Sequence, residues 1–188
     1  MEISKTRVLT ATLFLLAFLE RTLFDLGPNV EFVTLAIVLS SFYLKPKNSF
    51  LLIFAVIVVS DLVIGNTSIF IFTWSAFLIS AVLSSKLVQN KHFGYLKTIF
   101  VGTGLGIASN LFFYAWTNFG VWLMDSWGMY SNDFSGLMMS YVNGLPFLKY
   151  NLMSTILFVP LGVIVVESII SYASYIRRRV LLVHRSHI

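Results

Sequence analysis

The chain has 188 residues, of which 57% are hydrophobic and only 11% are charged, and its mean hydropathy is +0.86. A soluble domain carries a charged share of about 25%, so this composition excludes that class and indicates an integral-membrane protein. With no cysteine and only three histidines, the sequence also excludes disulfides and thiolate chemistry and offers little for an imidazole metal site.

A helix needs about 20 apolar residues to cross the hydrocarbon core of a bilayer. The first apolar run, near residues 8–25, follows a basic start that resembles a signal peptide. No small-residue cleavage site precedes Glu20, so we expect a retained span. Runs of spanning length follow near 49–65, 69–85, 98–116 and 151–176. A shorter run, near 31–44, is closed by Lys45, Pro46 and Lys47, a charged stop that contains a helix breaker.

The distribution of basic residues decides whether the short run near 31–44 crosses the membrane. If it crosses, the loops alternate between the two sides, and eleven of the 13 basic residues fall on one side. Omitting this span would scatter them over both faces, against the positive-inside rule. These eleven residues are Lys5, Arg7, Lys45, Lys47, Lys86, Lys91, Lys97, Arg177, Arg178, Arg179 and Arg185.

The sequence therefore predicts an all-α protein of the cell (inner) membrane, with six transmembrane helices and both termini in the cytoplasm. The net charge of +5 needs no nucleic-acid partner, because the excess lies in short cytoplasmic segments where the topology requires it. The expected partners are the lipid bilayer and a small-molecule substrate, and no cofactor is expected.

The outer connection between the fifth and sixth spans, residues 117–150, is too long for a turn. Within it, residues 135–147 suit a short interfacial or re-entrant helix ended by Gly144 and Pro146. We expect one domain, residues 1–188, in which this long structured loop forms a cap over the outer ends of the bundle.

Polar and aromatic residues gather near the outer ends of the predicted spans. An ionisable group inside the membrane costs several kcal/mol unless it is paired or faces a wet cavity, so we expect an ion pair between Arg21 and Asp61. Each aromatic residue taken singly also fits an interfacial belt, but a belt would place tryptophan at both faces. The asymmetry favours a pocket of rings and a few orienting polar groups. The candidate substrate-binding residues are Arg21, Asn29, Asp61, Asn110, Trp116, Asn118, Trp122, Tyr130, Tyr141 and Asn143.

The spacing of these residues resembles an uncharacterised bacterial integral-membrane family whose members look like the S components of energy-coupling-factor (ECF) transporters. The resemblance covers nearly the whole chain. It is carried by Arg21, Pro28-Asn29, Ser60-Asp61, Gly65, Asn110, Thr117-Asn118-Phe119-Gly120-Val121-Trp122, Tyr130, Gly136-Leu137, Tyr141, Pro146-Phe147 and Asn151.

The resemblance implies a six-helix fold and an outward-facing substrate pocket built from the first, third and fifth loops. S components capture a vitamin or metal ion and deliver it with a membrane T component and two ATPases, which are the partners that the resemblance implies. The small-residue AxxxA stripe that S components typically carry on the first helix for docking is absent. Four residues after Ala11 stands Leu15, and four after Ala17 stands Arg21.

The first functional hypothesis is therefore a membrane-embedded uptake protein that binds a vitamin-like small molecule. A metal substrate is disfavoured, because the predicted outer side has neither histidine nor cysteine. The alternative is a structural or accessory subunit of a larger membrane complex, in which the aromatic cap contacts another protein. An intramembrane enzyme is not expected, since the sequence has no HExxH, no GxSxG and no closely spaced carboxylate pair.

Overall fold

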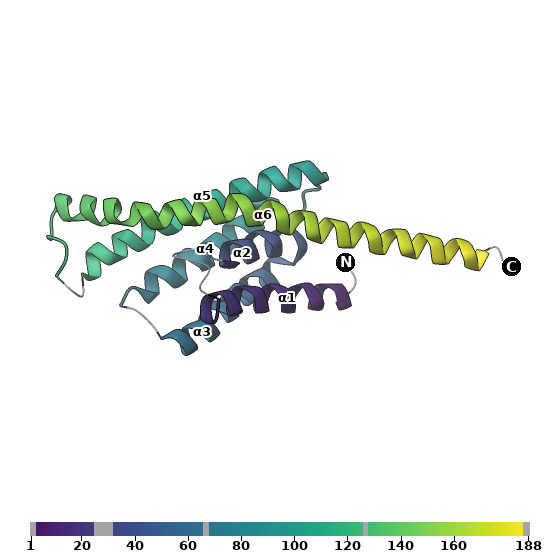
Figure 1. The fold of residues 1–188 in the computed structure, drawn as a ribbon, viewed down its shortest axis with the longest axis horizontal. Helices are drawn as coiled ribbons and strands as arrows, with labels where there is room; N and C mark the ends of the chain where they lie inside the picture. Colours follow the sequence, from purple (N-terminus) through teal and green to yellow (C-terminus); the bar gives the residue numbers. More distant parts are fainter. Residues whose placement is uncertain (1–2, 25–31, 66–67, 126–127, 186–188) are drawn as a thin grey trace.

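The computed structural model describes residues 3–24, 32–65, 68–125 and 128–185, and within these ranges it describes side chains from residue 6 to residue 176. The described residues form six α-helices (Figure 1). They are α1 (Ile3–Thr22), α2 (Phe32–Tyr43), α3 (Pro46–Ile64), α4 (Phe70–Val88), α5 (Tyr95–Met124) and α6 (Phe134–Arg185).

The short helix α2 lies at the centre of the bundle. It packs against each of the other five helices, and a continuous stretch of it from Val33 to Ser41 is buried. A helix that is apolar all round is stable only when it is surrounded, which explains why α2 is central. The other helices form an open ring around it, in which α1 packs on α3, α3 on α4, α4 on α5 and α5 on α6.

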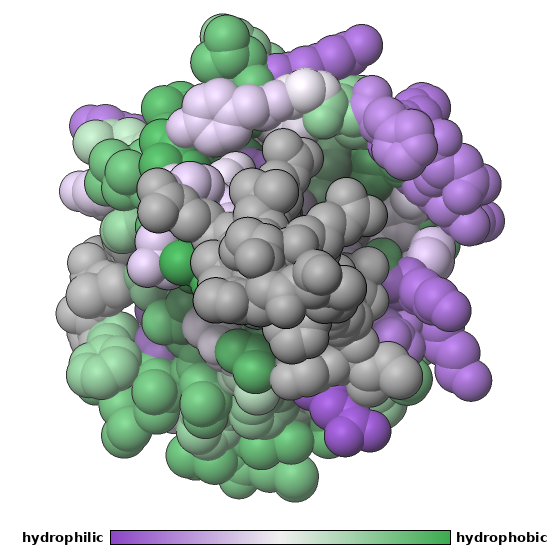
Figure 2. All heavy atoms as spheres, turned by 90° about the vertical axis from the view of Figure 1, so that its right-hand side faces the viewer, coloured by the Kyte–Doolittle hydropathy of each residue, from purple (hydrophilic) through white to green (hydrophobic). Residues whose placement is uncertain are grey.

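The two ends of the bundle differ in charge. Successive helices alternate in direction, so that α1 begins and α6 ends toward the same end (Figure 1). We name this the basic end, because its described loops and helix termini expose Arg7, Lys45, Lys47, Lys86, Lys91 and Lys97. Viewed directly, the hydrophilic residues of this end gather mostly along one side of the rim (Figure 2).

At the opposite end, α5 and α6 form a helical hairpin that extends beyond the other helices (Figure 1). We name this the hairpin end. The hairpin is the longest packed pair among the described helices, because α5 has 30 residues and α6 has 52.

Four helices, α3, α4, α5 and α6, are long and apolar enough to cross a membrane. The helix α2 is apolar but has only 12 residues, which corresponds to about 18 Å at 1.5 Å per residue. Each of the six apolar runs predicted from the sequence corresponds to a helix. The all-helical architecture is therefore confirmed, and four of the six described helices have the length and composition of membrane spans.

The predicted cap over residues 117–150 is not a separate loop. The helix α5 continues through Met124, and α6 begins at Phe134, so only residues 125–133 connect them. The polar residues that suggested the end of a span bond within their own helix. The Thr117 hydroxyl donates to the Phe113 carbonyl at 2.7 Å, and the Asn118 amide donates to the Tyr114 carbonyl at 2.8 Å.

The short helix predicted over 135–147 is instead the beginning of α6, which continues through both Gly144 and Pro146. Proline removes one backbone hydrogen bond from a helix, here the bond that the Val142 carbonyl would otherwise accept. Neighbouring helices can support such a turn. The Tyr114 hydroxyl of α5 donates to the adjacent carbonyl, that of Tyr141, at 2.7 Å. This bond attaches α6 to α5 one residue before the carbonyl that Pro146 leaves without its helical partner.

Two aspartates organise the connection between α5 and α6. The carboxylate of Asp125 accepts hydrogen bonds from the backbone N–H groups of Met129 and Tyr130. Asp133 caps the first turn of α6, because its carboxylate accepts the N–H of Gly136 at 2.8 Å. Hydrogen bonds from this N–H and from the Ser131 hydroxyl lower the pKa of the Asp133 carboxyl below its ordinary value.

Candidate functional site

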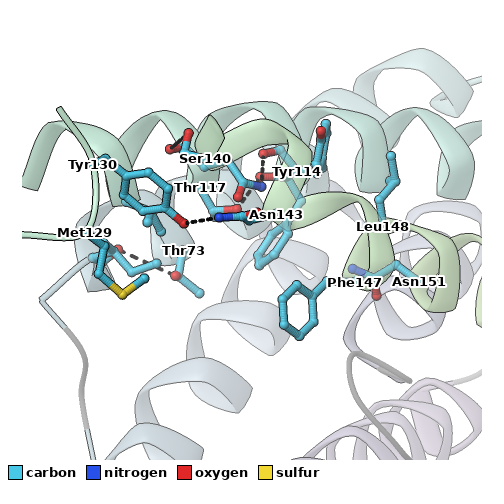
Figure 3. A pocket seen from close by; sticks show the side chains of 15 residues that line it. Thr73, Tyr114, Thr117, Met129, Tyr130, Ser140, Asn143, Phe147, Leu148 and Asn151 are labelled. Atoms are coloured by element: carbon cyan, nitrogen blue, oxygen red, sulfur yellow. Dashed lines mark hydrogen bonds between the residues drawn. The ribbon is translucent and has the colours of Figure 1, made fainter. Parts of the chain in front are cut away.

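A pocket of about 460 Å³ lies at the hairpin end, between α4, α5, α6 and the connection that follows α5 (Figure 3). Its volume falls within the range of about 300–1,000 Å³ found for small-molecule sites. The pocket is lined by Ile69, Thr73, Phe113, Tyr114, Thr117, Asn118, Val121, Met129, Tyr130, Ser140, Asn143, Gly144, Phe147, Leu148 and Asn151.

One wall of the pocket is a single face of α5. Tyr114, Thr117, Asn118 and Val121 stand three, four and seven residues apart, the spacing that places side chains on one helical face. The Asn118 amide nitrogen is bonded to the backbone of its own helix. Its carbonyl oxygen has no hydrogen-bond partner among the described residues, so it is available as an acceptor.

The opposite wall is a face of α6 that carries Ser140, Asn143, Gly144, Phe147 and Asn151. Gly144 allows the Asn118 side chain to pack against α6, since a Cβ atom at position 144 would lie 2.5 Å from the Asn118 side-chain oxygen and that side chain would have to shift. The Asn143 amide donates to the Tyr130 hydroxyl at 3.3 Å, which joins α6 to the connection (Figure 3).

Asn151 is the most unusual residue of the pocket. It is only 5% exposed, and its backbone carbonyl accepts a hydrogen bond from Asn110. Its side-chain amide borders the cavity, near Phe147 (Figure 3), and has no hydrogen-bond partner in the part of the chain that the structure describes. Its atoms are not among the fully enclosed unbonded polar atoms of the described residues, so the amide is open to the cavity and available to a ligand or water there.

The predicted ion pair between Arg21 and Asp61 is confirmed. The two side chains meet at 2.9 Å and are 11% and 8% exposed. Arg21 also donates to the Ser60 hydroxyl at 2.9 Å, and the Trp74 indole N–H donates to the second Asp61 oxygen at 2.6 Å. The pair joins α1, α3 and α4, and neither residue lines the pocket.

Asn110 also lies outside the pocket, in the core between three helices. It accepts the Thr34 hydroxyl at 2.8 Å, and its amide donates to the Asn151 carbonyl at 2.9 Å and to the Thr155 hydroxyl at 2.7 Å. At 2% exposure, all these bonds are protected from water. Asn110 therefore connects α2, α5 and α6.

The two predicted tryptophans pack around the pocket without lining it. Trp116 donates its indole N–H to the Ser75 hydroxyl at 2.8 Å and stacks with its ring centroid 5.9 Å from that of Phe119. Trp122 donates to the Ser131 carbonyl at 3.0 Å, which holds the connection against α5. Both aromatic residues therefore stabilise the hairpin end.

Three of the ten candidate residues line the pocket, namely Asn118, Tyr130 and Asn143. Tyr141 lies next to it, bonded to the Ala115 carbonyl at 3.1 Å, while Asn29 lies outside the described residues. The lining polar residues that the sequence analysis did not propose are Thr73, Tyr114, Thr117, Ser140 and Asn151.

The chemistry of the pocket is that of neutral hydrogen bonding. None of the described lining residues is charged, and the polar groups are amides, aliphatic hydroxyls and the phenols of Tyr114 and Tyr130. Nor do the described residues contain a group of three or more His, Cys, Asp or Glu side chains that could hold a metal ion. The site therefore combines aromatic surfaces with uncharged donors and acceptors.

Residues 2–175 match a family of unknown function (DUF6580), and the chain belongs to that family. No curated protein and no solved structure matches it. The expectation of an uncharacterised family is therefore confirmed, whereas these comparisons give no support to the resemblance to ECF S components.

Proposed function

We propose that this member of the DUF6580 family is a membrane-embedded binding protein for a small uncharged solute, which it takes up through the pocket at the hairpin end. The observation that carries the proposal is the side-chain amide of Asn151, which faces the cavity and has no hydrogen-bond partner in the described part of the chain. A solute in the cavity could bond to both the donor and the acceptor of this amide.

The charge of the solute follows from the lining. A charged ligand would lose its hydration on entering and find no described side chain of opposite charge, which makes its burial unfavourable. The nearby Arg21–Asp61 pair is already closed by its own hydrogen bonds. The rings of Phe113, Tyr114 and Phe147 suit a flat or apolar body, so we propose a neutral, ring-containing, vitamin-like solute.

The proposed topology has six crossings, with the basic end in the cytoplasm and the hairpin end outside. The exposed lysines and arginine of the basic end support this orientation through the positive-inside rule. The short α2 can take part because it is surrounded by protein rather than lipid. In this topology the pocket captures the solute from outside, as an S component does, and a T component with ATPases would energise its release.

The proposal is tested by substituting Asn151. We expect the purified protein in detergent to gain thermal stability with a neutral ring-containing solute from a vitamin panel, and not with charged analogues. Asn151→Leu should abolish this gain, because it removes the donor and acceptor that face the solute, while the ligand-free protein keeps a stability close to that of the wild type.

Asn132→Ala is the matched control, since Asn132 is an exposed asparagine at the same end and does not line the pocket. It should leave the response to the solute unchanged. A complete lack of response across the panel, or an unchanged response in Asn151→Leu, would contradict the proposed function.

A second candidate function, an accessory subunit of a membrane complex, is favoured by a separate observation. An apolar groove of about 500 Å³ lies between α1 and α6, with residues of α2 in its lining. The groove includes Val165, which is 56% exposed. Copurification of one stoichiometric membrane partner in mild detergent, lost when Val165→Trp fills the groove, would support this role over solute binding.

A further inference from the structure

A second groove, of about 650 Å³, lies on the other flank of α1, between α1 and α3, and is independent of the pocket. Its lining is divided into polar and apolar parts. The polar part consists of Thr6, Arg7, Thr10 and Asn48, and the apolar part consists of Ala11, Phe14, Leu15, Leu51, Leu52 and Ala55.

The two parts of this groove occupy different depths. Both α1 and α3 begin at the basic end, so Arg7 and Asn48 stand near the helix starts, and Phe14, Leu15 and Ala55 stand farther along. Arg7 and Leu15 are eight residues apart, which places them about 12 Å from each other along the helix axis. The groove thus runs from a cationic mouth to an apolar interior.

The cation at the mouth has no anionic partner within the described residues. Arg7 is exposed and forms no ion pair there. The described carboxylates that could reach into the bundle are engaged elsewhere: Glu20 accepts the N–H of Phe32, Asp61 pairs with Arg21, and Glu167 accepts the Tyr43 hydroxyl. The exposed Lys45 and Lys47 at the start of α3 add further positive charge.

We propose that this groove binds one anionic phospholipid, with its phosphate at Arg7 and Asn48 and one acyl chain along the apolar part. Arginine and amide donors suit phosphate oxygens. Outside the groove the acyl chain contacts other lipid chains, so its contacts with the apolar wall do not make this lipid bind better than another. The preference for an anionic lipid therefore comes from the attraction between its headgroup and the basic residues. An anionic phospholipid fits the groove because its negative headgroup would lie at the cationic mouth and its acyl chain would lie along the apolar interior.

The groove between α1 and α6 provides the internal comparison. Its described lining contains no charged residue, and Thr12 is its only polar side chain. This groove can hold acyl chains but has no group that selects a headgroup. We therefore expect lipid selectivity on the α3 side of α1 and none on the α6 side.

The test is native mass spectrometry of the full-length protein with phosphatidylglycerol and phosphatidylcholine of identical chain length. We expect one phosphatidylglycerol to be retained more strongly than any phosphatidylcholine. Arg7→Gln should weaken its retention about fivefold, the effect of losing one basic residue near an anionic lipid. Lys86→Gln, which removes an exposed charge at the same end but outside the groove, should have no such effect.

A second variant tests the apolar part without changing any charge. Ala11→Leu narrows the groove at an exposed position of α1, and it should weaken retention of phosphatidylglycerol while the thermal stability stays that of the wild type. Equal retention of the two lipids, equal loss in Arg7→Gln and Lys86→Gln, or displacement of the lipid by inorganic phosphate would each overturn the proposal.

Discussion

Asn110 and Asn151 are neighbours on facing helices, yet they differ in how their side chains are satisfied. Asn110 uses both ends of its amide to bond three partners on α2 and α6. Asn151 contributes its backbone carbonyl to that network, while its own amide borders the cavity without a partner among the described residues. We call the surroundings of Asn110 the closed region, because the polar groups of Asn110 are all bonded within the protein. We call the surroundings of the Asn151 amide the open region, because a polar group there is available to a ligand.

The difference extends to the regions around them. The closed region includes the Arg21–Asp61 pair with Ser60 and Trp74, in which each charged group has several partners. The open region is the pocket, where the Asn118 and Asn151 amides keep free capacity. We infer that substitutions in the closed region should change stability, and that substitutions in the open region should change ligand binding.

The largest effect is expected from breaking the closed region at its ion pair. Arg21→Met leaves the buried Asp61 carboxylate without its counter-charge, and removing one partner of a buried pair costs about 3–5 kcal/mol. The unfolding free energy in detergent should fall by this amount. The double variant Arg21→Met, Asp61→Leu should recover part of the loss, and a double variant less stable than Arg21→Met would contradict this account.

The next effect is expected at Asn110. Asn110→Leu keeps the volume but leaves the Thr34 hydroxyl and the Asn151 carbonyl without this partner, at about 1–3 kcal/mol for each buried group left unsatisfied. Denaturant titration should show lower stability, with the response to ligand retained in the fraction that folds. Loss of binding at unchanged stability would place Asn110 in the open region instead.

A comparison of two glycines sharpens the boundary between the regions. Gly144→Ala places a methyl group against the Asn118 amide, so we expect overpacking of about 1–3 kcal/mol together with weaker solute binding. Gly104, also within a helix, has no atom within 4 Å of an added Cβ, and Gly104→Ala should stabilise by up to about 1 kcal/mol. Thermal unfolding with and without solute measures the change in stability and the change in solute binding for each variant. Equal effects of Gly144→Ala and Gly104→Ala would contradict the close contact between position 144 and Asn118.

The smallest effect concerns pH at the Asp133 cap. Because the folded-state pKa of this carboxyl is lowered, its contribution to stability is fully present above the ordinary value of 3.8 and is lost as the pH falls through the lowered pKa. Unfolding of the wild type and of Asp133→Asn should therefore differ most near neutral pH and converge in acid. A difference that is constant from pH 2 to pH 6 would exclude the carboxylate as its origin.

The parts of the fold that depend on burial could be predicted from the sequence. Each apolar run corresponds to a helix, because a run of that length needs internal backbone hydrogen bonds in an apolar medium. The Arg21–Asp61 pair was predictable for a related reason, since two ionisable groups near the same depth are stable only when they neutralise each other.

The extent of α5 and α6 and the pocket between them could not be predicted in the same way. The side chains of Thr117 and Asn118 bond to their own helix, so a polar segment that suggested a loop is helical. Helical spacing then separates the residues of this segment: Thr117, Asn118 and Val121 face the pocket, while Phe119 stacks on Trp116. The sequence signal for the pocket was the helical spacing of its polar residues on α6. This spacing indicates a shared face only when α6 is known to be one continuous helix.

The continuity of α6 also has a mechanical consequence. Val159 and Val163 are fully buried, and between them Gly162 lies against side chains of α2, so α6 is held in the core at this stretch. The pocket residue Gly144 stands about 27 Å from Gly162 along the helix in one direction, and Ile176 stands about 21 Å from it in the other. Pro160 lies in the same stretch and removes one helical hydrogen bond there, so a bend at this point would change the angle between the pocket half of α6 and the half that leads to the basic end.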